Sequence, residues 1–408
     1  MTADIADVQD SAYSWRRLTV SLALSTLSGI GLWAPVVVLP SIQAEFGVDR
    51  AGASVPYTAM MVGFAAGGVL MGRIADRVGI MAPMVGGALA LGAGFSAAAF
   101  SSSYWMFVIA QAVLIGLLGC AASFGPLVAD VSLWFRRKRG IAVAVVSSGN
   151  YLAGVIWPPL LTVVIERYGW RNAYLLLAIV VVVAMLPLAL CLARRPPVEE
   201  RTAASATREA ARFTGTPLLQ GLLVLAGLSC CIAMSMPQVH IIAYCGDLGY
   251  GPARGAEMLS LMLGFGVVSR LVSGLIADRI GGVATLIIGS TLQCLALLFY
   301  IPFDGLASLY VVSSLFGLAQ GGIVPSYALI IRDYFPAREA GLRISLVLTA
   351  TVVGMALGGW LSGEIFDYTG SYRMAFLNGI GWNIVNLAIA GWILFQRPQR
   401  GIARQQAA

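Results

Sequence analysis

One arginine stands within an otherwise apolar stretch of this 408-residue sequence, where a charged side chain needs an explanation. Arg270 lies six residues before the end of the stretch 255–276, and its neighbours four residues away are Gly266 and Gly274, so no acid pairs with it along a helix. A guanidinium at the centre of a membrane-spanning helix costs about 2.5–3.5 kcal/mol on insertion scales. An unpaired guanidinium that faces a cavity is a good receptor for a carboxylate. We predict that Arg270 binds an organic anion; the alternative is that its long side chain reaches the membrane surface.

Other polar or aromatic side chains in apolar stretches could complete such a site. His240 is the only histidine and follows Pro237 and Gln238 in the stretch 217–244. Because histidine titrates near neutral pH, it could bind substrate or handle a proton; the alternative is a hydrogen-bonded histidine that only packs. Aromatic rings would shape a pocket for a carbon chain, and a few polar groups would orient it. The further candidates for lining the substrate path are Trp33, Asn150, Gln320 and Tyr327, of which Tyr327 is preferred.

The sequence offers no pattern for catalysis or for cofactor binding. Lys138 is the only lysine and lies between apolar stretches, which excludes a phosphate-binding G-x-x-x-x-G-K-[ST] loop and a Schiff-base lysine within the membrane. A single histidine and six cysteines without C-x-x-C spacing do not suggest a metal site. No nucleophile, base and orienting residue stand out together. We therefore expect no enzyme activity, no cofactor and no metal.

These residues must be positioned by helices that cross a bilayer, because the composition is that of a membrane protein. Hydrophobic residues make up 59% of the chain and charged residues only 11%, against about 25% charged residues in soluble domains. A bilayer core takes about 20 apolar residues per helix. Twelve charge-poor stretches fit this length and predict an all-α membrane protein with helices at 17–41, 52–72, 82–100, 104–131, 140–165, 172–193, 217–244, 255–276, 283–301, 306–331, 341–364 and 373–396.

The basic residues predict how these helices are oriented. If the N-terminus is cytoplasmic, 20 of the 26 Lys and Arg residues fall in tails or inward loops, five fall in outward loops, and Arg270 falls in a span. Positive charge favours the cytoplasmic side, so both termini are expected there. Residues 1–14 carry three aspartates rather than the basic start of a signal peptide, so the first helix is expected to stay. The net charge of +7 thus reflects topology in a multi-pass inner (plasma) membrane protein embedded in lipid, and nucleic-acid binding is not expected.

An internal repeat divides the chain into two halves. The segments 72–79 and 274–281, 202 positions apart, agree at six of eight positions. The only long polar stretch lies between the halves and predicts a cytoplasmic linker. Two halves of six helices each share one orientation, an arrangement associated with alternating access and with a substrate site between the halves. The predicted organisation is a cytoplasmic tail 1–16, a six-helix bundle 17–193, the linker 194–216, a second six-helix bundle 217–397 and a cytoplasmic tail 398–408.

The repeated segments carry charges suited to a conformational latch. Asp76 and Arg77 end the second span, Asp278 and Arg279 repeat them, and Asp130 lies near the cytoplasmic end of the fourth span. A cluster of carboxylate and guanidinium groups forms strong hydrogen bonds that can still be opened. We predict that these five residues hold a conformational state without touching the substrate; the alternative is a merely solvated loop.

The repeated G-x-x-x-D-R-x-G loop resembles the signature loop of the major facilitator superfamily, whose plan the twelve predicted spans fit. Within that superfamily, W-F-R-R-K-R-G at 134–140, followed by Gly149 and Gly154, together with R-L-V-S-G-L-I-A at 270–277, resembles the monocarboxylate porters and the related oxalate/formate antiporters. The resemblance implies the major facilitator fold of two pseudo-symmetric bundles. It also implies an anion-binding role for Arg270 and polar ligands in the helix that carries His240.

Two departures from these families bear on the cargo. Many monocarboxylate porters carry an acid four residues before the arginine of span eight, where this chain has Gly266, so coupling to a proton stays open. The oxalate/formate branch carries a second basic residue in span eleven. Here the stretch 341–364 has only Arg343, at its cytoplasmic start, which favours a monoanion over a dianion.

We therefore predict a secondary transporter that moves a small monocarboxylate such as lactate or pyruvate by alternating access, alone or with a proton. The alternatives are an organic-anion exchanger of the oxalate/formate type, an exporter of drugs or aromatic compounds, and a non-transporting receptor or scaffold. The sequence does not set the exact substrate, the direction of transport or the oligomeric state, for which a monomer is expected.

Overall fold

The computed structural model describes residues 9–135, 137–194 and 215–396, and nearly all of them are helical. The first half forms α2 (Ala12–Ser28), α3 (Ile30–Phe46), α4 (Arg50–Val78), α5 (Met81–Ala99), α6 (Tyr104–Ile109), the π-helix η1 (Ala110–Cys120), α7 (Ala121–Ser123), α8 (Gly125–Trp134), α9 (Arg139–Ser147) and α10 (Gly149–Leu190). The second half forms α11 (Pro217–Asp247), α12 (Pro252–Ile280), α13 (Gly282–Phe299), α14 (Leu306–Gln320), α15 (Ile323–Tyr334), α16 (Ala337–Thr369) and α17 (Tyr372–Phe395). The described residues contain no strand, which confirms the all-helical prediction. Most of the predicted linker 194–216, half of the tail 1–16 and the whole tail 398–408 lie outside the described residues.

Eleven of the described helical segments are long and apolar enough to cross a membrane. The longest covers 51 residues from Gly140 to Leu190, where the sequence predicts two helices at 140–165 and 172–193. The backbone is kinked within this segment at Gly169, whose φ of 79° lies in the left-handed region that glycine adopts without strain. The kink falls between the two predicted helices.

Short polar residues and glycines set the helix boundaries. Asp49 caps α4, because its Oδ1 accepts a hydrogen bond from Gly52 N at 2.7 Å, and Thr216 caps α11 by accepting from Leu219 N at 3.1 Å. Such caps satisfy N–H groups that have no partner within the helix. Gly370 follows α16 with a φ of 66°, the usual conformation of a glycine that ends a helix. The apolar stretches therefore end where these residue types interrupt them.

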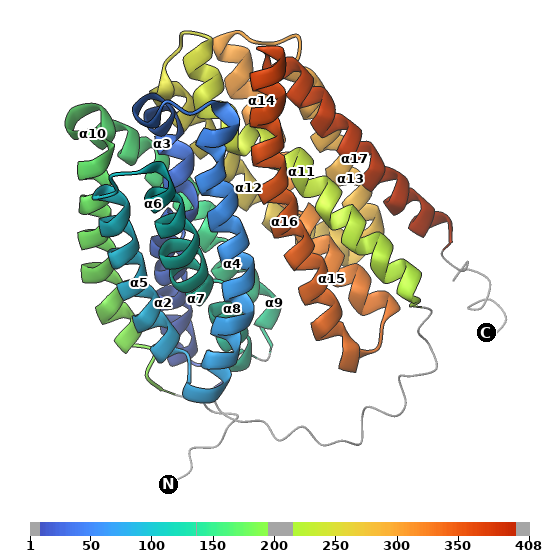
Figure 1. The fold of residues 1–408 in the computed structure, drawn as a ribbon. Coiled ribbons are helices and arrows are strands. Elements are labelled where there is room, and N and C mark those ends of the chain that lie inside the picture. Colours follow the sequence, from blue (N-terminus) through green and yellow to red (C-terminus); the bar gives the residue numbers. More distant parts are fainter. Residues whose placement is uncertain (1–8, 136, 195–214, 397–408) are drawn as a thin grey trace, which may run out of the picture.

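The helices form two lobes, with α2 to α10 in the first and α11 to α17 in the second (Figure 1). The lobes touch through α4 against α16 and through α10 against α12. Thr58 Oγ1 donates to Ala356 O at 2.9 Å in the first contact, and Ser260 Oγ donates to Val155 O at 2.5 Å in the second. We call the end at which α2 begins and α17 ends the lower end, and the opposite end the upper end, as drawn in Figure 1.

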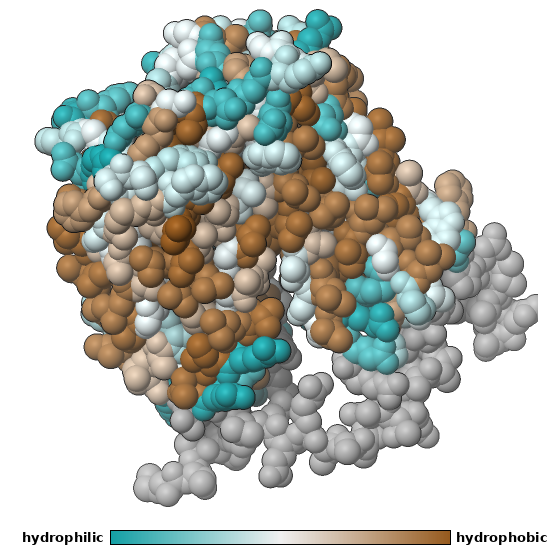
Figure 2. All heavy atoms as spheres, viewed as in Figure 1, coloured by the Kyte–Doolittle hydropathy of each residue, from teal (hydrophilic) through white to brown (hydrophobic). Residues whose placement is uncertain are grey.

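Figure 2 shows the two lobes joined at the upper end and parted at the lower end. On the face drawn, hydrophobic residues cover the middle of the molecule, and hydrophilic residues gather at the upper end and at the lower tips. Many large apolar side chains are exposed, among them Val183 and Leu275, each 68% exposed. Such a surface suits contact with lipid. The surface between the lobes is open toward the lower end.

Two glycines allow a close helix contact within the first lobe, between α4 and η1. A Cβ atom on Gly63 would lie 2.0 Å from Ala112 O, and one on Gly67 would lie 2.1 Å from Leu117 O. Glycines spaced by four residues let two helix backbones approach in this way. Gly68, the next residue along α4, has nothing within 4 Å of its Cβ position. The face that carries Gly63 and Gly67 is therefore closed to larger side chains, whereas position 68 is open.

The substitution Gly67→Ala is expected to lower the free energy of unfolding by about 1–3 kcal/mol, because the added methyl group must push η1 away from α4. The adjacent control Gly68→Ala is expected to be neutral or to stabilise the helix by up to about 1 kcal/mol, because alanine favours helix more than glycine does. Unfolding of the purified protein in mixed detergent micelles measures both. Equal effects of the two substitutions would contradict this account of the contact.

Candidate functional site

Arg270 lies half-buried on α12 where the two lobes meet, and no carboxylate pairs with it in the described part of the chain. Its Nη1 donates to Ser147 O of the first lobe at 2.8 Å, and its Nε lies 3.5 Å from Gly321 O of the second. The guanidinium carbon lies 4.3 Å from the ring centroid of Tyr151 on α10. Carbonyl oxygens and an aromatic face attract a cation without neutralising it. The positive charge is therefore held between the lobes with no counter-charge from the described chain.

The space one turn above Arg270 on α12 is filled by the Tyr151 ring. A Cβ atom on Gly266 would lie 2.6 Å from Tyr151 Cε1 and 3.6 Å from Gln320 Nε2. A side chain at position 266 would therefore need the ring to move. Tyr151 is itself only 8% exposed, so it packs over Gly266 and Arg270 together. The first lobe thus contributes the aromatic wall of the site, and the second contributes the charge.

Two glutamines of the second lobe lie beside this group. Gln238 Nε2 on α11 donates to Gln320 Oε1 on α14 at 2.5 Å. Gln320 Nε2 is buried near Gly266 and has no hydrogen-bond partner among the described residues. A buried donor without a partner costs about 1–3 kcal/mol. A polar ligand between the lobes would give this amide an acceptor.

Trp33 and Asn150 form the neighbouring contact within the first lobe. Trp33 Nε1 donates to the main-chain oxygen of Asn150 at 3.0 Å, and a Cβ atom on Gly154 would lie 2.8 Å from Trp33 Cε2. Asn150 Oδ1 is buried without a hydrogen-bond partner among the described residues. Trp33 on α3 is thus joined to the main chain of α10 one residue before Tyr151, and neither Trp33 nor Asn150 shows a hydrogen bond to Arg270.

Tyr327 lies apart from Arg270, in a polar network inside the second lobe. Its hydroxyl donates to Asn386 Oδ1 on α17 at 2.8 Å, and Asn386 Nδ2 donates to Ser290 Oγ on α13 at 2.7 Å. The Tyr327 side chain is fully buried. Its hydroxyl therefore stabilises contacts between helices of one lobe in this conformation.

His240 lies near the upper end of α11 and is fully buried. Its Nε2 is 2.7 Å from Gly359 O, which can only accept, so Nε2 donates. Its Nδ1 is 3.0 Å from the Tyr372 hydroxyl, which donates to it when the ring is neutral. Both ring nitrogens thus have protein partners, which is the arrangement of a packing histidine.

The charged residues predicted to form a latch are in different surroundings. Asp76 and Arg77 at the end of α4, and Asp278 and Arg279 at the end of α12, are exposed and form no ion pair with described residues. Asp130 is buried on α8, and its two oxygens accept from Arg17 Nε and Nη2 at 2.8 and 2.9 Å. Arg17, near the start of α2, is only 2% exposed, and its guanidinium carbon lies 4.6 Å from the Trp134 ring centroid. The structure thus joins Asp130 to α2 rather than to the repeated loop.

Sequence patterns did not single out Tyr151 or Gln238 as members of this group. Residues two positions apart on a helix point about 200° apart, so Gln238 and His240 face opposite sides of α11. Hydropathy does not tell which side faces the other lobe. Tyr151 follows Asn150, and its place over Gly266 depends on the contact between α10 and α12, which no local pattern reveals. Groups of three or more metal-binding side chains do not occur among the described residues.

Comparisons with known proteins bear on the fold and the family. The sequence pattern of the family described as Major Facilitator Superfamily matches residues 22–306 and 258–407. The chain is 25% identical over 307 residues to MFS-type transporter pynF of Aspergillus niger, which covers 74% of this chain and 69% of that protein. It is 25% identical over 331 residues to Monocarboxylate transporter 13 of Bos taurus, covering 80% and 75%. A crystal structure of a bacterial homologue of the human lysosomal transporter Spinster, inward-facing and unoccupied, matches with a TM-score of 0.72 at 13% identity over 95% of this chain and 97% of that one, a likeness of fold.

The Arg17–Asp130 pair gives a prediction about stability. Asp130→Asn is expected to lower the free energy of unfolding by about 3–5 kcal/mol, because it leaves the buried guanidinium uncompensated. Replacing both residues with apolar ones, Arg17→Met with Asp130→Leu, is expected to recover most of that loss. Arg254→Gln, in a pair whose side chains are 51% and 42% exposed, is the control and should cost no more than about 1 kcal/mol. Unfolding in mixed micelles measures all three, and a double variant as unstable as Asp130→Asn would contradict the explanation.

Proposed function

This chain belongs to the Major Facilitator Superfamily and resembles its monocarboxylate transporters, and on that premise we propose that it moves a small monocarboxylate across the inner membrane by alternating access, with Arg270 as the anion-binding residue. One observation carries the proposal: the Arg270 guanidinium lies between the lobes with carbonyl groups and an aromatic ring around it and with no carboxylate from the described chain. The carboxylate of the cargo supplies the missing charge.

The proposed topology has twelve spans and a cytoplasmic lower end. The kink at Gly169 divides the longest apolar segment into two helices. Each has the roughly 20 residues that a helix needs to cross a bilayer. Of the 26 basic residues, 20 belong to the tails and loops that this orientation places in the cytoplasm. The lobes are parted at the lower end, so this conformation is open to the cytoplasm (Figure 2).

The binding step follows from the acceptors that Arg270 has now. A carboxylate entering from the lower end takes the place of Ser147 O at Nη1 and forms a charge-assisted hydrogen bond, which is stronger than a bond to a neutral carbonyl. The Gln320 amide offers a second donor, and the Tyr151 ring covers the carbon chain. A neutralised guanidinium costs less to enclose than a charged one, so a loaded site lowers the barrier to closing the lower end.

A single arginine matches one carboxylate, which supports a monoanion such as lactate or pyruvate.

The predicted conformational latch is proposed to act when the lower end closes. Asp76, Arg77, Asp278 and Arg279 are exposed at the ends of α4 and α12 while the lobes are apart. Closure would bring those helix ends toward the facing lobe, where their charges find partners. Asp130 is held by Arg17 in this conformation and would have to exchange that partner to join the latch.

Uptake by proteoliposomes tests the role of Arg270. With labelled lactate, pyruvate, formate or oxalate supplied outside, with and without an inward proton gradient, we expect uptake of a monocarboxylate by the unchanged protein. Arg270→Gln should reduce it at least about tenfold, because a hydrogen bond to a charged group contributes about 1.5–3 kcal/mol. Arg254→Gln removes an exposed arginine from the same helix and should leave uptake unchanged.

The proton gradient distinguishes proton symport from substrate exchange. Stimulation of uptake by the gradient indicates symport, and stimulation only by internal substrate indicates exchange. Uptake that Arg270→Gln leaves intact, in a variant that elutes as a folded species, would overturn the assignment of Arg270. Preference for oxalate over the monocarboxylates would overturn the choice of a monoanion.

Tyr151 gives a second test of the same site. Tyr151→Leu is expected to raise KM for the monocarboxylate roughly two- to thirtyfold, because a ring over a guanidinium contributes about 0.5–2 kcal/mol and also walls the pocket. Tyr151→Phe keeps the ring and should stay within about twofold of the unchanged protein. If Tyr151→Phe is as impaired as Tyr151→Leu, the hydroxyl rather than the ring is the group that acts.

A further inference from the structure

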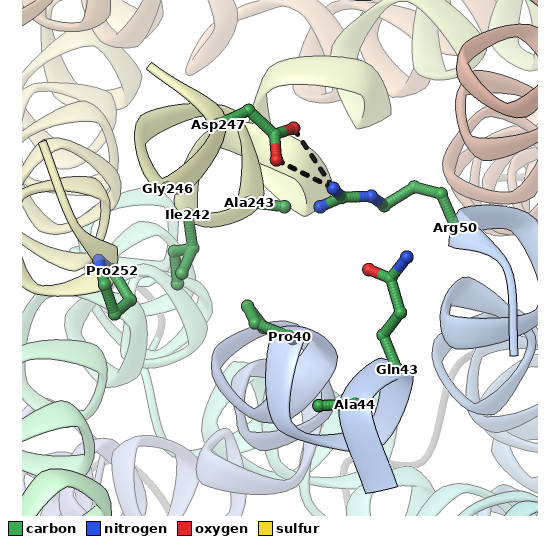
Figure 3. A pocket seen from close by; sticks show the side chains of 9 residues that line it. All are labelled: Pro40, Gln43, Ala44, Arg50, Ile242, Ala243, Gly246, Asp247 and Pro252. Atoms are coloured by element: carbon green, nitrogen blue, oxygen red, sulfur yellow. Dashed lines mark hydrogen bonds and ion pairs between the residues drawn. The ribbon is translucent and has the colours of Figure 1, made fainter. Parts of the chain in front are cut away.

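A charge cluster joins the two lobes at the upper end of the molecule. Arg50 is the first residue of α4 in the first lobe, and its Nη2 donates to both carboxylate oxygens of Asp247, at 2.9 and 3.1 Å (Figure 3). Asp247 is the last residue of α11 in the second lobe. The other ion pairs among described residues each stay within one lobe, namely Arg17–Asp130, Arg171–Glu45, Arg254–Glu257 and Arg343–Glu339.

A second acid of the second lobe binds the backbone at the same place. Asp367, near the end of α16, accepts from Arg50 N at 2.9 Å and from Ala51 N at 2.6 Å. The first N–H groups of a helix have no partner within it and carry partial positive charge, so a carboxylate there is favourable. Asp49 already caps this helix from its own chain segment by binding Gly52 N. The beginning of α4 is thus held both by its own cap and by the facing lobe.

Aromatic rings of the second lobe enclose the Arg50 side chain, which is only 8% exposed. Its guanidinium carbon lies 4.8 Å from the Phe366 ring centroid and 5.9 Å from that of Tyr372. The Tyr372 hydroxyl is bonded to His240, which in turn donates to Gly359 O of α16. The buried histidine therefore keeps in place one of the rings that face Arg50.

The two helices are packed closely below this cluster. A Cβ atom on Gly363 would lie 2.7 Å from Ala51 Cα, and one on Gly359 would lie 3.3 Å from Tyr57 Cδ1. Beside the ion pair, a pocket of about 360 Å³ lies between α3 and α11 and is lined mainly by apolar atoms of Pro40, Ala44, Ile242 and Ala243, with Gln43 opposite Arg50 (Figure 3). The pocket leaves room for the arginine to swing away from Asp247 without displacing a packed helix.

We propose that Arg50, Asp247 and Asp367 form the gate that closes the upper, extracellular end. The outward-open state requires the Arg50–Asp247 ion pair and both hydrogen bonds that Asp367 accepts from the beginning of α4 to break. The inference rests on alternating access but on no particular cargo. While the gate is shut, Arg50 has a carboxylate partner and little contact with water. When it opens, water can hydrate all three charges. Removing either acid therefore weakens only the shut state and shifts the balance toward opening at the upper end.

Distances between spin labels test the gate in the full-length protein reconstituted without substrate. The six native cysteines are replaced, and labels are attached to Tyr168→Cys in the first lobe and Phe303→Cys in the second, at upper positions that are 65% and 49% exposed. In this background Asp247→Asn and Asp367→Asn should each add a population with a longer distance between the labels. Asp367 bonds only main-chain groups of α4, so its variant supplies a test that leaves the Arg50–Asp247 pair in place.

The matched control is Glu45→Gln, which removes the Arg171–Glu45 pair within the first lobe near the same end. It should leave the distance distribution unchanged, because both partners move together. Unchanged distributions in both Asp247→Asn and Asp367→Asn would overturn the gate, and so would an equal shift in Glu45→Gln. Because no substrate is present, these outcomes are independent of whether Arg270 binds a carboxylate, which the uptake assay decides.

Discussion

A guanidinium inside a membrane-spanning helix stays charged at any physiological pH, so its surroundings must offset an insertion cost of about 2.5–3.5 kcal/mol. At Arg270 the compensation comes from both lobes: a carbonyl of α9, the ring of Tyr151 on α10, and a carbonyl that follows α14. None of these groups carries a negative charge. Any motion that parts the lobes at this depth takes acceptors away from the arginine, so the positions of the lobes and the compensation of the Arg270 charge are energetically linked.

Much of the fold could be predicted because bilayer-spanning helices are long, apolar and interrupted by few residue types. The predicted breaks near residues 49, 79, 250 and 370 coincide with caps and glycines in the structure. The predicted break between 165 and 172 coincides with the kink at Gly169, where a glycine with positive φ separates two helices within a single residue. How α4, α10, α12 and α16 bring the lobes together depends on packing between distant helices, which hydropathy does not encode.

The candidate site was predictable to the extent that an unpaired charge in an apolar stretch is visible in sequence. Arg270 met that criterion, whereas Tyr151 and Gln238 look like ordinary interior residues until α10 and α11 are placed beside α12. Arg17 shows the reverse difficulty. A basic residue at the start of a span resembles an anchor at the membrane surface, and its burial depends on Asp130, 113 positions away, which no local pattern connects to it.

Arg50 and Arg270 each bridge the two lobes, but their partners differ. This difference gives a physical reason why the lobes can have two stable arrangements. Arg50 is neutralised by Asp247, and Asp367 binds the backbone beside it, so closure of the upper end is favoured by charges that the protein itself supplies. Arg270 has no such acid, and the Tyr151 ring fills the space over Gly266 where one would stand. The contact at the upper end is therefore complete without cargo, whereas in the proposed function an anion completes the central one. An empty carrier would rest with its upper end shut and its charged site open below, and a bound carboxylate would remove the electrostatic penalty that opposes closing the lower end.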